Sequence, residues 1–261
     1  MRSLNIAATG MMAQQTNVDV ISHNLSNVTT TGYKRQRPEF QDLIYQNQIR
    51  VGTNSSDAGT VVPTGIQLGL GVKTAATYRN MTQGTVELTD NSLDVAINGK
   101  GFLVVQQPNG EDAYTRNGAL QLSPEGEIVT SDGFLVSPGI VVPDDAIAVS
   151  ISPAGIVEVE IDGQIEPTEL GQLELVTFVN EPGLQAIGDN MYLETAASGD
   201  PLQGFGGEEG FGSILQGYLE NSNVDPVYEI TRLIVAQRSY EMNSKVVSAS
   251  DEMLQALNQT A

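Results

Sequence analysis

Apolar residues near the C-terminal end of the chain recur at alternating steps of three and four positions. They follow Asp225-Pro226, a pair typical of a helix start, because proline suits the first helical turn and aspartate can accept hydrogen bonds from its free N–H groups. We predict a helix over residues 226–258, about 50 Å long at a rise of about 1.5 Å per residue. The spacing is that of a coiled-coil seam. Its positions are Leu233, Ala236, Tyr240, Asn243, Val247, Ser250, Leu254 and Leu257, widened by Ile230, Ile234, Val246 and Met253.

The N-terminal end repeats the same spacing, so the two ends are candidates to pair. The positions are Leu4, Ala8, Met11, Gln15, Val18, Ser22 and Leu25. Ser3 can cap this helix, and the run Thr29-Thr30-Thr31 before Gly32 predicts its end near Val28. The spacing also fits two ordinary amphipathic helices packed on a central domain.

Between the helices the pattern changes to short apolar runs separated by turn signals such as Asn109-Gly110 and Asp132-Gly133. Runs about ten residues apart predict an antiparallel sandwich or barrel-like domain. The predicted strands are 93–97, 102–106, 113–116, 127–130, 134–137, 147–151, 156–161, 173–179 and 191–194. The expected fold class is therefore α+β, with a β-rich domain inserted between two terminal helices.

We divide the chain into an N-terminal helix (1–30), a connector (31–80), a β-rich domain (81–221) and a C-terminal helix (222–261). Within the connector, residues 50–72 are rich in Gly, Ser, Thr and Asn, which predicts a long, extended, hairpin-like excursion. The segment 199–212 holds six glycines without the Lys-Ser/Thr of a phosphate-binding loop, and we expect a mobile loop.

The composition excludes several kinds of chemistry. The chain has no cysteine and one histidine, His23, so thiolate chemistry and sites with two imidazoles are excluded. Acidic pairs occur at Asp144-Asp145, Glu158 with Glu160, and Glu208-Glu209, which leaves a secreted acidic glycan hydrolase as an alternative. Nothing around these pairs indicates a buried acid and no Trp is present, so we expect no enzyme activity, no cofactor and no metal site.

The net charge of −20 is concentrated in the middle, where residues 51–221 hold four basic and 24 acidic side chains. This balance argues against nucleic-acid binding. The cluster Lys34-Arg35-Arg37 is the local exception, and we interpret it as a solvated or partner-facing patch. Nearly neutral ends on an acidic middle indicate that the ends associate. No apolar run is long enough for a membrane span, and no cleavable leader is recognisable.

Both ends carry motifs that resemble those of bacterial flagellar rod and hook axial proteins. At the N-terminal end the resemblance rests on Asn17, on Asn24-Leu25-Ser26-Asn27 and on Thr31-Gly32-Tyr33-Lys34. At the C-terminal end it rests on Asn221-Ser222-Asn223-Val224-Asp225, Ala236-Gln237-Arg238-Ser239-Tyr240-Glu241 and Asn243-Ser244-Lys245. The segments 40–46, 64–73, 177–184 and 192–194 are similar to the distal-rod branch of this family, so the resemblance covers essentially the whole chain.

This resemblance implies a structural subunit without a cofactor, exported without a cleaved signal peptide. Its terminal helices would pair and join copies of the chain into a stiff hollow tube, with the acidic domain outside. Proximal-rod proteins, hook proteins and ring proteins of the basal body would be its neighbours. A proximal-rod or hook subunit is the alternative within the family. The resemblance also implies that the arms order only on assembly and that residues 50–72 stiffen the tube.

Overall fold

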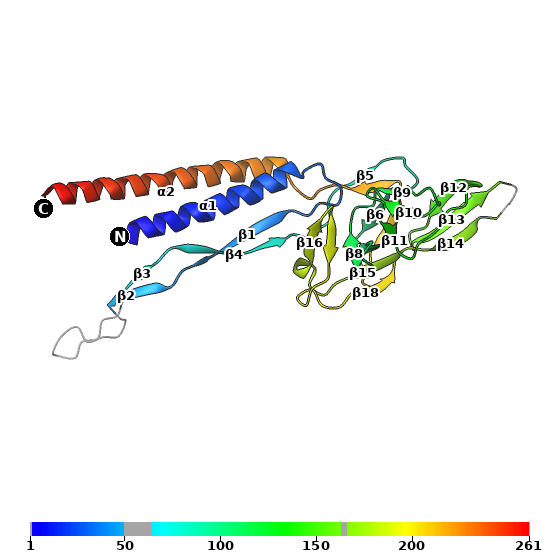
Figure 1. Cartoon of the computed structure of the whole chain (residues 1–261), viewed down its shortest axis with the longest axis horizontal. Coiled ribbons are helices and arrows are strands. Elements are labelled where there is room, and N and C mark those ends of the chain that lie inside the picture. The colour runs from blue at the N-terminus through cyan, green and yellow to red at the C-terminus, as the bar shows by residue number, and fades with distance from the viewer. Residues whose placement is uncertain (1, 50–63, 163–165, 261) are drawn as a thin grey trace. The chain divides into compact units, whose positions relative to one another are not determined.

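The computed structural model describes residues 2–49, 64–162 and 166–260, and the chain forms two helices with a β-rich middle (Figure 1). The expected α+β class is confirmed. Helix α1 spans Arg2–Ser26 and helix α2 spans Pro226–Thr260. No described helix is long and apolar enough to cross a membrane.

The chain divides into two compact units, which we describe separately. The first, called here the arm, contains residues 1–25, 36–78 and 225–261, and the second, called here the body, contains residues 26–35 and 79–224. The arm holds both helices and the strands β1 (Gln36–Asp42), β2 (Tyr45–Ile49), β3 (Ile66–Gly69) and β4 (Val72–Arg79, its last residue in the body). The body holds the remaining strands.

Those strands are β5 (Val86–Leu88), β6 (Val95–Asn98), β7 (Phe102–Gln106), β8 (Asp112–Thr115), β9 (Leu120–Leu122), β10 (Ile128–Thr130), β11 (Leu135–Val136), β12 (Ala146–Ile151), β13 (Ile156–Ile161), β14 (Thr168–Gln172), β15 (Glu174–Thr177), β16 (Gln185–Gly188), β17 (Met191–Leu193), β18 (Leu202–Phe205), β19 (Ser213–Gln216) and β20 (Tyr218–Glu220). The pairings between them are antiparallel.

The start of α2 follows the sequence signal. Oδ1 of Asp225 accepts hydrogen bonds from the backbone N–H groups of Val227 (2.9 Å) and Tyr228 (3.2 Å), which satisfies two of the donors left free at a helix N-terminus. The prediction for α1 was less accurate. Ser3 lies inside the helix, which begins at Arg2, so it is not the cap, and α1 ends at Ser26, two residues before the predicted end.

In the arm, the connector forms strands. Strand β1 pairs with β4, and β2 pairs with β3 in register Tyr45↔Gly69. The ribbon is fastened to α1 at Thr9, whose Oγ1 accepts a hydrogen bond from the N–H of Val72 (3.4 Å). Residues 50–63 of the predicted excursion lie outside the described residues, so only its two flanking strands can be compared with the prediction.

Strand β7 lies at the centre of the body and is buried on both faces. It pairs with β8, β11 and β15, and its alternate side chains enter two different cores. Leu103 and Val105 belong to the larger core, and Phe102 and Val104 belong to the smaller one. The uninterrupted apolar run of this strand is explained by burial on both sides.

The smaller core is aromatic. Phe178 packs edge-on against Tyr114 with ring centroids 4.8 Å apart, and Phe102 packs edge-on against Phe178 and Tyr192 at 6.1 and 5.9 Å. Such edge-to-face contacts add about 0.5–1.5 kcal/mol each to the burial of the rings. They fix the faces of β7, β8 and β17 against one another.

Tyr114 makes this core sensitive to alkali. Burial raises the pKa of the Tyr114 hydroxyl to about 12, helped by the carboxylates of Glu194 and Asp112. The folded state then keeps a proton that the unfolded chain has lost, so stability should fall between about pH 10 and 12 by roughly 1–2 kcal/mol. In Tyr114→Phe, this pH-dependent loss of the free energy of unfolding should disappear. Urea unfolding at a series of pH values between about 9 and 12 measures it. An unchanged alkaline slope would contradict this account.

The glycine-rich segment was predicted to be a mobile loop, and this was wrong for its centre. Strand β18 pairs with β15 along its full length. A side chain at Gly204 would place its Cβ 2.3 Å from the ring of Phe211, and one at Gly212 would lie 2.7 Å from the carbonyl oxygen of Asn98. These glycines allow close packing of the backbone, which composition alone does not distinguish from a flexible loop.

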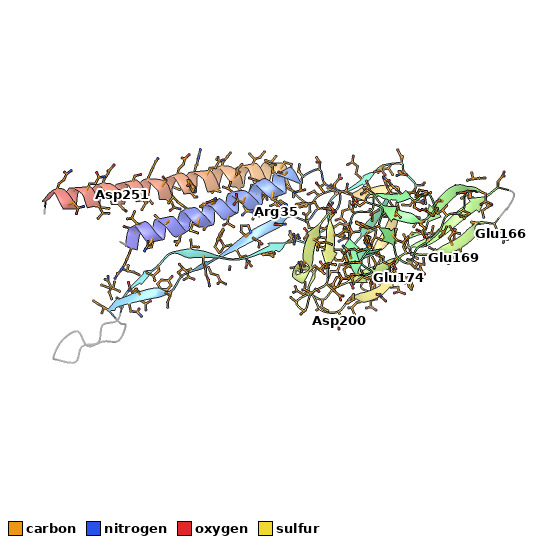
Figure 2. All side chains as sticks on the ribbon, in the orientation of Figure 1. Arg35, Glu166, Glu169, Glu174, Asp200 and Asp251 are labelled. Carbon is orange, nitrogen blue, oxygen red and sulfur yellow. The ribbon has the colours of Figure 1, made fainter. Side chains whose placement is uncertain are left out.

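The acidic character of the body lies on its surface. Figure 2 labels Glu166, Glu169 and Asp200, and all three are exposed. Glu158 on β13 is only partly exposed, whereas Glu160 on the same strand is exposed. Glu208 has a structural contact, because its carboxylate accepts a hydrogen bond from the N–H of Phe205 (3.1 Å). Among the described residues, no group of three or more acidic or histidine side chains could hold a metal ion.

Candidate assembly interface

Among the described residues, contacts that join α1 to α2 within the arm recur at intervals of seven residues along α1. Moving forward along α1 by seven residues corresponds to moving backward along α2, so the two helices are antiparallel (Figure 1). The contacts are Ser3 with Ser250, Gly10 with Asn243, Asn17 with Arg232, and Asn24 with Glu229. All four involve small or polar side chains.

The second contact depends on a glycine. A Cβ built at Gly10 would lie 2.9 Å from Nδ2 of Asn243, which is closer than real Cβ atoms approach other atoms. Asn243 therefore occupies the space that a side chain on residue 10 would need. Ser250 contributes a similar close approach, since its Oγ donates to Oγ of Ser3 at 3.3 Å and the residue is buried.

The fourth contact is a buried polar cluster built on Asn24. Its side-chain amide donates to the carbonyl of Gln36 and accepts from the N–H of the same residue, both at 2.8 Å, and it also donates to Glu229 (3.4 Å). Asn24 and Glu229 are fully buried. One amide thus connects the end of α1, the start of β1 and the first turn of α2. The sequence marked Asn24 as part of the N-terminal motif, and the structure gives it this set of contacts.

The predicted seam positions differ between the two helices. On α2, Ala236 and Ser250 are buried, and Leu233, Asn243, Val247 and Leu254 are half-buried, whereas Tyr240 is 45% exposed. On α1, Leu4, Met11, Val18 and Leu25 are half-buried and Ala8 is exposed. Each of the four half-buried residues directly follows a residue that contacts α2. The face of α1 that contacts α2 is therefore shifted by one position from the predicted face. The side chain of Leu257 lies outside the described residues.

Large apolar side chains remain in solvent on the rest of α2. Ile230, Ile234, Val246 and Met253 were expected to widen the seam, but they are 46%, 46%, 47% and 59% exposed. The contacts described above thus use small and polar groups, and although Val20, Ile21 and Ala236 are buried, the four larger apolar side chains on α2 stay exposed. This is the reverse of a helix pair that is stable by itself.

A buried ion cluster lies in the body where the chain enters and leaves it. Glu220 forms ion pairs with Lys34 at 2.6 Å and with Arg116 at 3.1 Å. Lys34 and Glu220 are each 1% exposed and Arg116 is 5% exposed. Burial lowers the pKa of Lys34, and so does the neighbouring Arg116 charge, while Glu220 opposes both. Lys34 was interpreted as part of a solvated basic patch, and this was wrong, because its ammonium group is buried against a carboxylate 186 residues further along.

Three residues of the terminal motifs support this cluster, which we call the entry clasp (Lys34, Arg116 and Glu220). The N–H of Gly32 donates to the carbonyl of Glu220 (2.7 Å), and a Cβ at Gly32 would lie 2.9 Å from the backbone of Arg116. Asn223 accepts from the N–H of Arg35 (2.7 Å) and donates to the carbonyl of Thr82 (2.9 Å). Asn27 accepts a hydrogen bond from the hydroxyl of Thr30 at 3.1 Å in the turn before Gly32.

Glu220 and Arg116 were not among the residues selected from the sequence for this role. Neither stands in a local pattern that marks it as buried, because the partners come together only in the folded body. The available signal was indirect: Arg116 is the last residue of the predicted strand 113–116, and Glu220 directly precedes the C-terminal motif. Local sequence does not pair them.

These features are those of a structural protein that assembles: an arm with unpaired apolar helix faces, and a body tied internally where the chain enters and leaves it. Three family models match the chain. "Flagella basal body rod protein" matches residues 4–34, "Flagellar hook protein FlgE/F/G D1 domain" matches 96–159, and "Flagellar basal body rod FlgEFG protein C-terminal" matches 215–260.

Full-length relatives agree with these matches. The flagellar basal-body rod protein FlgG of Caulobacter vibrioides is 56% identical over 259 residues, covering 99% of both chains. The protein of the same name from Buchnera aphidicola subsp. Acyrthosiphon pisum is 49% identical, and the match covers 98% of both chains. The one from Borreliella burgdorferi is also 49% identical, and the match covers 99% of this chain and 98% of the relative. The chain belongs to the flagellar basal-body rod protein family.

Proposed function

We propose that this chain is a structural subunit of the distal part of the flagellar basal-body rod. Copies of it assemble through the arm into a stiff hollow tube that transmits torque and lets exported subunits pass. The observation that carries the proposal is the arm itself, whose two helices meet through small and polar side chains while large apolar side chains remain exposed. Covering those side chains needs neighbouring copies, and a repeated contact that does not close gives a helical tube.

The seam positions are assigned a role in this assembly. Leu4, Met11, Val18 and Leu25 on α1 and Leu233, Val247 and Leu254 on α2 are only half-buried within one arm, so they have surface left for neighbouring helices. The polar residues at the contact, Asn243 and Ser250, fix the register of the pair at a cost in stability. Proximal-rod proteins, hook proteins and the surrounding ring proteins are the expected neighbours of the tube, and the basal body is the expected location.

The exposed helix faces also predict that the arm is loosely held before assembly. An isolated helix gains most of its stability from packing, and here much of that packing surface is unused. Limited proteolysis of the dilute chain should remove both helices and leave a core of about residues 26–224, identified by mass spectrometry. The same chain in isolated basal bodies should resist from end to end.

Two results would contradict the proposal. Resistance of the whole dilute chain would show that the arm needs no neighbour. Absence of the chain from isolated basal bodies would remove the rod assignment itself.

A further inference from the structure

A cavity between α1 and α2 in the arm is not used by any contact described so far. Its volume is about 420 Å³, and its lining consists of Gln15, Val18, Gln237, Tyr240 and Glu241. Three of the five come from the C-terminal motif. The cavity therefore joins an aromatic ring, a carboxylate and two amides at one place on the surface of the helix pair.

This combination suits a guanidinium group. The face of a tyrosine ring attracts a planar cation, a carboxylate pairs with it, and amide oxygens accept its remaining N–H groups. The apolar part of the lining, Val18 and the Tyr240 ring, suits the methylene stem of the same side chain. An uncharged apolar side chain would leave Glu241 unpaired if the cavity closed over it.

The arm also carries a guanidinium that has no partner among the described residues. Arg238 is exposed, and neither an ion pair nor a hydrogen bond joins its side chain to another described part of the chain. The other arginine of α2, Arg232, already contacts Asn17 and the ring of Tyr228. Arg238 thus supplies the group that the cavity lacks.

Helix geometry keeps Arg238 from reaching the aromatic part of the cavity of its own arm. At about 100° per residue, Arg238 projects roughly 200° away from Ala236, the buried position that faces α1, and equally far from Tyr240. Glu241 is three residues from Arg238 and neighbours it on the helix surface, but no ion pair joins the two among the described residues. Arg238 therefore cannot lie over the Tyr240 ring of its own helix.

We propose that the cavity receives the Arg238 side chain of a second copy of this chain. The inference rests on the proposed assembly and specifies one of its contacts. A one-sided pairing leaves one cavity and one arginine free, so the contact can continue from copy to copy along the assembly. The balanced charge of the arm allows such pairing between copies, whereas the acidic body does not.

Charge reversal tests the contact in cells that lack their own copy of the chain. Glu241→Arg and Arg238→Glu should each abolish assembled rods and swimming, and the double variant, which restores complementary charges, should recover both. The thermal midpoint of the body should be unchanged in all three. Lys245→Glu, an equally exposed reversal on α2, is the matched control and should assemble.

Cross-linking gives an independent readout because the chain contains no cysteine. Rods assembled from a mixture of the single variants Glu241→Cys and Arg238→Cys, treated with a short bismaleimide, should give covalent dimers. Neither single variant alone should be cross-linked. A dimer from either single variant alone would place two identical residues together and overturn the proposal.

The outcomes separate the contact from the function. If the unaltered chain builds rods and either single reversal also assembles normally, the contact is wrong while the rod assignment stands. If Glu241→Arg fails but Arg238→Glu assembles, the cavity takes another cation and the proposal is overturned. If the unaltered chain builds no rods, the proposed function fails.

Discussion

Replacing Glu220 by glutamine should lower the free energy of unfolding of the body by about 3–5 kcal/mol, the usual cost of removing one partner from a buried ion pair. The variant leaves Lys34 and Arg116 facing each other without the carboxylate that neutralises both. Glutamine keeps the size of the side chain and an acceptor for the N–H of Gly84, so the loss reports charge and not packing. For a unit of this length the melting temperature should fall by roughly 10 °C.

The measurement is urea unfolding followed by circular dichroism, with Glu209→Gln as the control. Glu209 is exposed, and its neutralisation changes the net charge by the same amount. The control should stay within about 0.5 kcal/mol of the original chain. A loss below about 1 kcal/mol for Glu220→Gln would show that the entry clasp is not an important ion pair.

The clasp also shows where sequence reasoning stops. Lys34 stands in a basic run that looks solvent-exposed, and Glu220 is one of many acids in an acidic middle segment. Their pairing depends on β20 and the Gly32 turn meeting in the body, which is a property of the folded chain. The acidic composition therefore predicted surface charge and did not reveal that the Glu220 carboxylate pairs with two buried cations.

Signals that act within a few residues were read more accurately. Asp225-Pro226 predicted the start of α2, and the runs at 102–106 and 156–161 match β7 and β13. Short strands such as β9 and β16 were missed because three or four residues carry too little periodicity. Strand β18 was missed because glycine suggests flexibility unless the approaching backbone or ring, here Phe211, is known.

The pairing of α1 and α2 was predicted in part from the sequence. A repeat of three and four residues shows that one face of a helix differs from the others. On α1, however, two adjacent sets of residues both follow this repeat, so the repeat does not show which set contacts α2. The sequence favoured the face with Leu4, Met11 and Val18, whereas the contacts with α2 use Ser3, Gly10 and Asn17. Small residues allow the closer approach, and the larger ones stay half-exposed. That division is what makes the larger ones candidates for contacts between copies.

Replacing Leu254 by aspartate should therefore abolish assembly while leaving the body folded. Leu254 is half-buried near the C-terminal end of α2. The exposed part of its side chain can pack against a helix of a neighbouring copy. A carboxylate buried there without a partner costs several kcal/mol for every subunit added. A penalty of about 3 kcal/mol corresponds to a factor of roughly 100 in the concentration needed for polymerisation.

The neighbouring residue provides a matched control. Gln255 is exposed one position further along the same helix, so Gln255→Asp adds the same charge without placing it on the seam. Pelleting and electron microscopy should show tubes with Gln255→Asp and none with Leu254→Asp, and the thermal midpoint of the body should be the same in both. Normal tubes from Leu254→Asp would show that this face of α2 stays in solvent after assembly. The apolar faces of the arm would then need a different explanation, because assembly would leave at least one of them uncovered.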